Sequence, residues 1–470
     1  MKPLSHLDRL FVWLIFIHYL VFELVFFYGE AARDSGLAIV ITGWKTMFPL
    51  ALLLYTGFPP RQFFDRQPSV GWYTTLFGLL MAWAVVPCLL SDYPGTSILS
   101  WFKLVPRGIF YLGILSFFAA RPAAFAVLAK LIVSFCAVTV AQYILLVLTG
   151  SQNRSTYLPG MGAILFAGPF GVLGNVTSLL QYASLPFAIP RLCGFWQEPS
   201  NAASSMFVSF FLARYLRSTG YRKFWTILGW ACFCGGLLCL SNAGYIAISA
   251  AAAFGSFFRK SKSITDYAAK ALIFLAVAVF AVVALFGRSY VAKNMPDNAI
   301  ACALVGVRTD RESATSDEYD PSSGRILLME AALEQVKQRI WGIGVLPGGD
   351  GGPYAMLSAS APIAWFTCTG VLGLALLMAR EAVLLRAGIR YAKLSKGARF
   401  LVQAWIVILV QQASYGLWMD PLYFIGATGV SIVAPQALAH IADRRERMRG
   451  FAGRGRVPVG AWSALGNGPA

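Results

Sequence analysis

Charge is what this sequence has least of. Only 13% of its 470 residues are charged, whereas soluble domains carry roughly 25%. Hydrophobic residues make up 57% of the chain, and the mean hydropathy is +0.63. The length would allow about three soluble domains, but apolar runs recur along nearly the whole chain. These features argue against a set of soluble domains and favour one helical bundle embedded in lipid.

Acidic residues are scarcer than basic ones, with 21 Asp and Glu against 39 Lys and Arg and a net charge of +18. An excess of this size first suggests nucleic acid. The basic residues, however, gather in short segments between the apolar runs, as the positive-inside rule predicts. The sequence also lacks the aromatic motif of RNA-binding domains and the glycine-rich Walker loop. We therefore expect no nucleic-acid partner.

Patterns that bind metals are missing as well. The eight cysteines and three histidines show no CxxC spacing, and Cys232, Cys234 and Cys239 fall in one apolar stretch. Cysteine in a helical bundle is usually a small core residue. The sequence predicts no metal, no cofactor and no disulfide framework.

The apolar runs have the length of membrane spans, which need about 20 residues each. The first run is too long for the core of a signal peptide and has no clear cleavage site, so we expect it to stay in place. We predict an all-α, polytopic transmembrane bundle of about 12 spans. The candidate spans are residues 10–28, 36–57, 70–90, 97–120, 122–149, 201–217, 223–240, 242–258, 270–287, 355–379, 400–418 and 421–440. The pair that flanks Ser241 and Asn242 could instead be one re-entrant hairpin.

The basic residues alternate between connections and so predict an orientation. With a cytoplasmic N-terminus, the even-numbered connections hold the Lys and Arg clusters, and the stretch from Arg380 to Arg399 is one of them. Short odd-numbered connections hold almost none. Both termini are then cytoplasmic. The predicted parts are spans 1–9 in residues 1–287, a large loop in 288–354, spans 10–12 in 355–440 and a basic cytoplasmic tail in 441–470.

Two long loops, residues 150–200 and 288–354, lie on the face away from the cytoplasm in this topology. Long loops of this kind usually carry function. The second loop contains an amphipathic helix that starts near Ser322, presents apolar residues every three or four positions as far as Ile340, and ends in a glycine-rich turn. We expect this helix to lie along the mouth of the bundle.

The strongest local motif begins at Arg191 and reads Arg-Leu-Cys-Gly-Phe-Trp-Gln-Glu-Pro, with Trp196 and Glu198 inside it. Pro199 starts a span, so Glu198 lies where the helix dipole favours a negative charge. One interpretation is purely structural: a capped span with an Arg and a Trp anchored at the membrane interface.

This motif resembles the R-x-x-G-x-(aromatic)-x-E-P signature of the bacterial O-antigen ligase and polysaccharide polymerase superfamily (Wzy/WaaL). Other segments of the chain are similar to the family's elements. They are Leu240–Gly244, matched weakly to a Ser-rich element; Ser323-Gly-Arg325 and Gly342-Ile-Gly344, at the start and end of the large loop; and Gly370-Val-Leu-Gly373 on the span that follows. The resemblance covers roughly residues 70–440 in architecture, and it is specific in sequence only around Arg191 and Arg325.

The resemblance implies a GT-C-like enzyme of the bacterial inner membrane that joins sugars carried on undecaprenyl pyrophosphate at the periplasmic face. Arg191 and Arg325 would be catalytic, because two arginines can clamp the pyrophosphate with bidentate hydrogen bonds and stabilise it as it leaves, without a metal. The implied partners are the lipid-linked oligosaccharide, membrane lipid, a chain-length regulator (Wzz/Wzc-like) and a Wzx-type flippase.

A proton acceptor for the attacking sugar hydroxyl is harder to find. Ligases of the family place a His just before the Gly-x-x-Gly span, but residues 356–361 contain none. His18 lies in the first span and is expected to be a packed polar residue. Glu198 is then the candidate base, with a salt bridge that orients Arg191 as its alternative role. The missing His favours a polymerase over a ligase.

Charges inside the spans complete the predicted substrate-binding set. Lys103 and Arg107 are four residues apart, so they share a helix face and could line a cavity for an anionic headgroup; the alternative is that both snorkel to the interface. Trp196 and Arg339 belong to the same set. For Lys130 we favour snorkelling.

The sequence thus predicts a metal-independent polymerase that joins lipid-linked oligosaccharide repeats into O-antigen, capsule or exopolysaccharide. Two alternatives stay open. One is a ligase of the same superfamily. The other is a transporter or flippase of lipid-linked sugars, for which broken helices and charges within the membrane would be suitable.

Overall fold

The computed structural model describes residues 4–24, 36–59, 61–148, 177–180, 189–192, 196, 199–258, 263–295, 334, 337–345, 361–414 and 420–435. This part of the chain is helical apart from one antiparallel pair of strands, β1 (Thr177–Leu180) and β2 (Ile189–Leu192). The helices are α1 (His6–Leu24), α2 (Gly36–Thr56), α3 (Arg61–Arg66), α4 (Pro68–Trp83), α5 (Val85–Leu89), α6 (Pro94–Phe102), α7 (Val105–Ala120), α8 (Pro122–Leu148), α10 (Pro199–Ser218), α11 (Phe224–Leu238), α12 (Asn242–Phe257), α13 (Ile264–Asn294), α16 (Ala361–Leu394), α17 (Lys396–Ser414) and α18 (Pro421–Thr428), which continues into the π-helical turn η5 (Gly429–Val433).

Five stretches of the described chain are long and apolar enough to cross a membrane: Ile39–Thr56, Pro68–Leu89, Pro94–Ala120, Pro122–Leu145 and Pro362–Leu394. They indicate a membrane-embedded helical protein, as the sequence predicts. The other predicted spans overlap described helices that are not among these five. The number of twelve spans and the orientation of the termini therefore stay predictions.

The structure differs from the sequence-based expectation at three places. The strands β1 and β2 lie within the long loop 150–200, where no strand was expected. The predicted span 97–120 is divided into α6 and α7, because Pro106 has no N–H to bond the carbonyl four residues earlier. The predicted span 355–379 ends too early, since α16 runs on to Leu394 and buries Arg380 completely.

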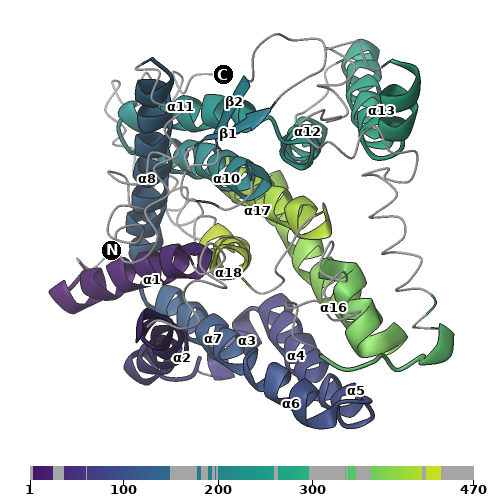
Figure 1. Ribbon diagram of the computed structural model, residues 1–470. Coiled ribbons are helices and arrows are strands. Elements are labelled where there is room, and N and C mark those ends of the chain that lie inside the picture. Colours follow the sequence, from purple (N-terminus) through teal and green to yellow (C-terminus); the bar gives the residue numbers. More distant parts are fainter. Residues whose placement is uncertain are drawn as a thin grey trace.

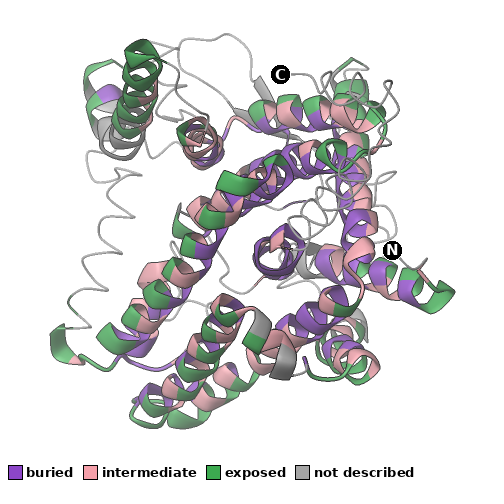
Figure 2. Ribbon diagram, turned by 180° about the vertical axis from the view of Figure 1, so that it is seen from behind, coloured by how far each residue is buried: buried purple, intermediate pink, exposed green. Residues whose placement is uncertain are grey.

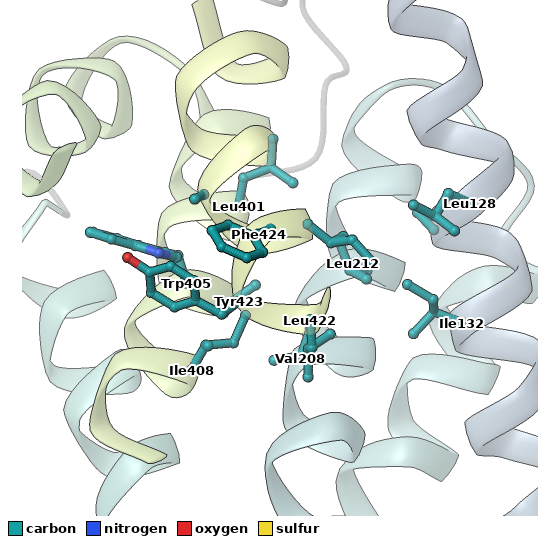
Figure 3. Packing of buried hydrophobic residues seen from close by; sticks show 14 of the residues in the cluster. Leu128, Ile132, Val208, Leu212, Leu401, Trp405, Ile408, Leu422, Tyr423 and Phe424 are labelled. Carbon is teal, nitrogen blue, oxygen red and sulfur yellow. The ribbon is translucent and has the colours of Figure 1, made fainter. Parts of the chain in front are cut away.

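A buried helix occupies the middle of the bundle. In Figure 1, α18 lies between α1, α7 and α17, and it contacts all three. Every residue from Pro421 to Ile425 is buried, and Figure 2 shows the helix buried on all sides. In Figure 3, Leu422 and Phe424 lie among Leu212 of α10 and Leu401 of α17. A helix that is apolar all round belongs in a core, and α18 with η5 is short, about 20 Å at 1.5 Å per residue.

The end of the bundle that carries the basic residues is fastened by Asp8 of α1. Its carboxylate accepts hydrogen bonds from Ser5 and Tyr55 and pairs with Arg121, which follows α7. Burial raises the pKa of the Asp8 carboxyl. The hydrogen bonds from Ser5 and Tyr55 and the charge of Arg121 outweigh that effect, so the pKa lies below its ordinary value of 3.8. Asp8 thus joins α1, α2 and the α7–α8 turn.

Candidate functional site

Three helix ends meet inside the bundle, and polar side chains join them. The first two turns of α10 contribute Asn201 and Ser204, and the last turn of α17 contributes Gln411. The Gln411 amide donates to Asn201 Oδ1 at 2.8 Å, and Ser204 Oγ donates to Gln411 Oε1 at 2.8 Å. Ser204 and Gln411 are both buried. The N-terminus of α10 is therefore fixed against the C-terminus of α17.

The third end is the N-terminus of α18, which Asp420 caps. Asp420 Oδ1 accepts from the Tyr423 backbone N–H at 2.6 Å, and Oδ2 accepts from Gln412 Nε2 at 2.7 Å. Such a cap satisfies one of the free N–H groups at the start of a helix. Gln412 is 5% exposed, and its Oε1 has no hydrogen-bond partner among the described residues. Gln412 is adjacent to Gln411, so the last turn of α17 is bonded to both of the other helix ends. We call the residues that make these bonds the end cluster (Asn201, Ser204, Gln411, Gln412 and Asp420).

Burial dominates the electrostatics of Asp420. It raises the pKa of the carboxyl from 3.8 to about 6, although the hydrogen bonds from Tyr423 and Gln412 and the positive charge of Arg107 favour the carboxylate and oppose the rise. Asp420 is half-buried, whereas the five residues that follow it are buried. At neutral pH the group is mostly ionised but can take up a proton at modest cost.

The end cluster lies far from the basic end of the bundle. Arg107 precedes Arg121 by 14 residues in sequence, Asn201 precedes Arg217 by 16, and Gln412 follows Lys396 by 16. At 1.5 Å per residue these separations are about 21–24 Å along the helices. These separations are most of the thickness of a hydrocarbon core, which is about 30 Å, so the cluster and Arg107 lie at the end of the bundle remote from those basic residues.

A second polar group lies one turn deeper, on the other side of Tyr423. Glu381 of α16 accepts hydrogen bonds from Arg380 and from the Tyr423 hydroxyl, and Arg380 also donates to that hydroxyl. The hydroxyls of Tyr73 and Tyr423 are 2.6 Å apart. The Arg380 guanidinium carbon lies 5.0 Å from the centre of the Tyr73 ring and 5.4 Å from that of Phe77. This ion pair fastens α4, α16 and α18 together.

The predicted Arg191 motif lies at the start of α10. Arg191 is paired with Ser178 in the two-stranded sheet, and β2 packs on α8, α10 and α11. Trp196 is completely buried, and its indole N–H donates to the Tyr19 hydroxyl at 3.3 Å. That hydroxyl donates in turn to Ser205 of α10 at 3.0 Å. Trp196 therefore fixes the approach to the helix that carries Asn201 and Ser204.

The other predicted site residues are spread over the structure. Lys103 is exposed at the end of α6, whereas Arg107 is half-buried in the first turn of α7 and acts electrostatically on Asp420. Arg339 pairs with Asp92 at 2.5 Å, and both side chains are largely exposed. Glu198 and Arg325 lie outside the described residues, as does the side chain of Arg191.

The two glycine motifs of the resemblance are packed together. Gly370, with φ of 68°, interrupts α16. The freed carbonyls are bonded by the turn that ends the large loop: Ile343 N–H donates to Thr367 O at 3.0 Å, and Gly344 N–H donates to Cys368 O at 3.0 Å. A Cβ at Gly342 would collide with the Cys368 carbonyl. We call this pairing of residues 340–345 with 367–371 the clasp.

The expected amphipathic helix 322–340 is described only at its end. Glu334, Lys337 and Gln338 are helical, and Lys337 bonds Glu334 at 2.6 Å. The rest of the predicted helix lies outside the described residues. Among the charges in the spans, Lys130 places its ammonium 3.8 Å from the centre of the Tyr221 ring, beyond the end of α10.

Sequence reasoning missed the end cluster and the buried ion pair. One signal was available: Asp420-Pro421 is an N-cap followed by a helix-starting proline. Nothing in the pattern marked Gln411 and Gln412, which interrupt an apolar run, as members of a shared site. In the described chain, no three His, Cys, Asp or Glu side chains gather closely enough to hold a metal ion.

No family model matches the chain, and no curated protein matches it significantly.

Proposed function

We propose that the protein is a polymerase that joins oligosaccharide repeats carried on undecaprenyl pyrophosphate, at the periplasmic face of a bacterial inner membrane. The observation that carries this proposal is the convergence of two helix N-termini and Arg107 around the end cluster, at the end of the bundle remote from the basic residues that follow α7 and α10 and begin α17. The Arg191 motif leads directly into one of these helices.

This convergence is chemically suited to a pyrophosphate. Each helix N-terminus carries about half a positive charge and free N–H groups. The partial charges and N–H groups at the N-termini of α10 and α18 add to the charge of Arg107. The Arg107 guanidinium can form two parallel hydrogen bonds to phosphate oxygens. Arg191 stands seven residues before Glu198, on the segment that leads into the first turn of α10. A lipid tail could then lie between apolar helices while the phosphates stay with the cations.

The resemblance adds the reaction class. Arg191, Glu198 and Arg325 match its motifs, and the clasp joins the two glycine motifs into one structural unit. In the proposed reaction, the cations stabilise the pyrophosphate as it leaves the first sugar. A ligase of the same superfamily would use the same donor and transfer the glycan to a different acceptor.

The buried helix α18 favours a second candidate, a flippase for lipid-linked sugars. Transporters often build their substrate site from short, discontinuous helices inside the bundle, and α18 is a short helix buried in the middle of this one. A flippase moves the lipid without forming a glycosidic bond, so the two functions differ in their products.

The deciding experiment uses cells that lack the protein. We expect them to accumulate single lipid-linked repeats on the periplasmic side and to regain long polymer when the wild-type gene is restored. Accumulation on the cytoplasmic side would support a flippase, and polymer of normal length in the deleted cells would contradict the polymerase proposal.

The phosphate site can be tested in the purified protein with undecaprenyl pyrophosphate as the probe. Binding to the folded state raises thermal stability, so we expect this lipid to raise the unfolding temperature of the wild type. The rise should be much smaller for Arg107→Ala and Arg191→Ala. Arg386→Ala serves as the matched control, because Arg386 is exposed on α16 toward its basic end. Equal rises in all four proteins would contradict the proposed phosphate site.

A further inference from the structure

The end cluster contains acceptor atoms that a pyrophosphate cannot satisfy. Gln412 Oε1 is buried and has no hydrogen-bond partner in the described part of the chain, while the Nε2 of the same amide bonds Asp420 Oδ2 at 2.7 Å. Buried polar atoms normally have a partner, and an amide oxygen needs a donor. An ionised pyrophosphate offers only acceptors. A sugar carries several hydroxyls, each with one O–H donor, so two neighbouring hydroxyls of one sugar can bond Gln412 Oε1 and Asp420 separately.

The carboxylate beside that amide is held in a fixed position. Asp420 is tied to the start of α18 through the Tyr423 N–H at 2.6 Å and to α17 through Gln412. It is half-buried at the point where α18 begins. Each carboxylate oxygen has further lone pairs, so both known hydrogen bonds can persist while the group accepts another.

We propose that Asp420 and Gln412 form the binding site for the attacking sugar: Asp420 accepts the proton of the attacking hydroxyl, and Gln412 Oε1 accepts a hydrogen bond from a neighbouring hydroxyl of the same sugar. The inference rests on the polymerase function proposed above. In this proposal the two parts of the site bind different groups. Arg107 and the helix N-termini bind the phosphates of the donor, whereas Asp420 and Gln412 bind hydroxyls of the acceptor sugar.

The step balances as follows. The hydroxyl oxygen of one chain forms a bond to the anomeric carbon of the other chain's first sugar, and its proton passes to an Asp420 oxygen. The bond between that anomeric carbon and the phosphate oxygen breaks. Its electron pair leaves with undecaprenyl pyrophosphate, whose charge Arg107 offsets. Asp420 then loses the proton to solvent, which restores the carboxylate.

The surroundings of Asp420 agree with this role. The titratable groups on the elements packed around α18 and η5 include His18 on α1, Arg107 and Tyr111 on α7, and Arg380 and Glu381 on α16. α8 adds Lys130, and α17 adds Lys396 and Arg399 in its first turn. Of these, Arg107 acts on Asp420 and favours its carboxylate form. With a pKa of about 6, Asp420 is ionised at neutral pH yet basic enough to take a proton, which suits a general base.

The test measures elongation by the purified full-length protein in lipid nanodiscs. The probe is the native lipid-linked repeat extracted from cells that lack the protein. We expect Asp420→Asn to lower the elongation rate about 100-fold or more, while the start of α18 is kept because Asn is also a good N-cap. The wild-type rate should fall as the pH drops through about 6, and the residual rate of Asp420→Asn should lack this fall.

Gln412→Leu provides a second variant that does not remove the carboxylate. It deletes a hydrogen bond that lowers the pKa of Asp420, so the acidic fall in rate should move to higher pH; a fall set by the titration of another group would not move. Glu334→Gln is the control, because Glu334 is an exposed carboxylate paired with Lys337, and its rate and pH profile should match the wild type.

Two results would overturn the inference while leaving the polymerase intact. One is an Asp420→Asn protein that elongates within tenfold of the wild type and keeps the acidic fall. The other is an unshifted fall in Gln412→Leu, which also decides the matter if Asp420→Asn does not fold. A wild-type protein that does not elongate the repeat at all would overturn the polymerase proposal itself.

Discussion

The buried pair of Arg380 and Glu381 gives the sharpest prediction about stability. We consider Glu381→Leu, which replaces the carboxylate with an apolar side chain of similar size and so removes the partner charge of Arg380. Glu381 Oε1 accepts from Arg380 and from Tyr423, and Arg380 is 0% exposed. The substitution therefore leaves a guanidinium in the core without its counter-charge.

Removing one member of a buried ion pair costs about 3–5 kcal/mol, mostly because the remaining charge is uncompensated. We expect Glu381→Leu to lose about that much free energy of unfolding. The double variant Arg380→Met with Glu381→Leu removes both charges, and such replacements are often neutral or stabilising. It also loses the contacts of Arg380 with the Tyr73 and Phe77 rings; a desolvated contact of this kind is worth about 2 kcal/mol or more. The double variant should therefore be more stable than the single one.

Equilibrium unfolding in mixed micelles, titrated with dodecyl sulfate, measures these differences. Glu334→Leu is the comparison, because it breaks an exposed pair with Lys337 and should cost less than about 1 kcal/mol. The reasoning is refuted if the double variant is no more stable than Glu381→Leu, since the cost would then arise from lost packing and not from a stranded charge.

Two further predictions concern the clasp and the basic end of the bundle. Gly370→Ala places a Cβ against the Ile340 carbonyl at a positive φ, so we expect a loss of more than about 1 kcal/mol in thermal unfolding; Gly78→Ala, in a helix with open space around it, should instead be neutral or slightly stabilising. The pKa of Asp8 lies below its ordinary value of 3.8, so its pair with Arg121 stabilises the fold above that pH. This contribution should be lost as the pH falls through the lowered pKa. The difference in unfolding temperature between the wild type and Asp8→Asn should shrink on acidification, and a constant difference would contradict this account.

The helix boundaries that follow from local chemistry could be predicted from the sequence. The span predicted at 242–258 corresponds to α12, Asn242–Phe257. Ser241 caps it by accepting from the Gly244 N–H at 3.3 Å, and a serine before an apolar run is a local signal. The same holds for α8, which begins at Pro122. Apolar length and capping residues act within a few positions, so a single sequence contains them.

The buried polar groups could not be predicted in this way. Arg380 belongs by pattern to a series of basic residues that marks a cytoplasmic connection. Its burial depends on Glu381 and on Tyr423, and Tyr423 meets Tyr73 across 350 positions of the chain. Asp420 likewise gains its properties from Gln412 and Arg107, which belong to other helices. Contacts between distant segments determine whether a charge is paired, and no periodicity records them.

The position of α18 also constrains the order in which the bundle can be assembled. The helices that surround it, α1, α7 and α17, all precede it in the chain and are therefore synthesised first. Until residues Pro421–Val433 have been synthesised, α18 and η5 cannot fill the space between these helices. We infer that the last stage of folding is the entry of a short apolar helix into a nearly finished bundle. Because Asp420 and Tyr423 enter with it, both polar groups described above would form only at that stage, so the protein would become active only once its centre is closed.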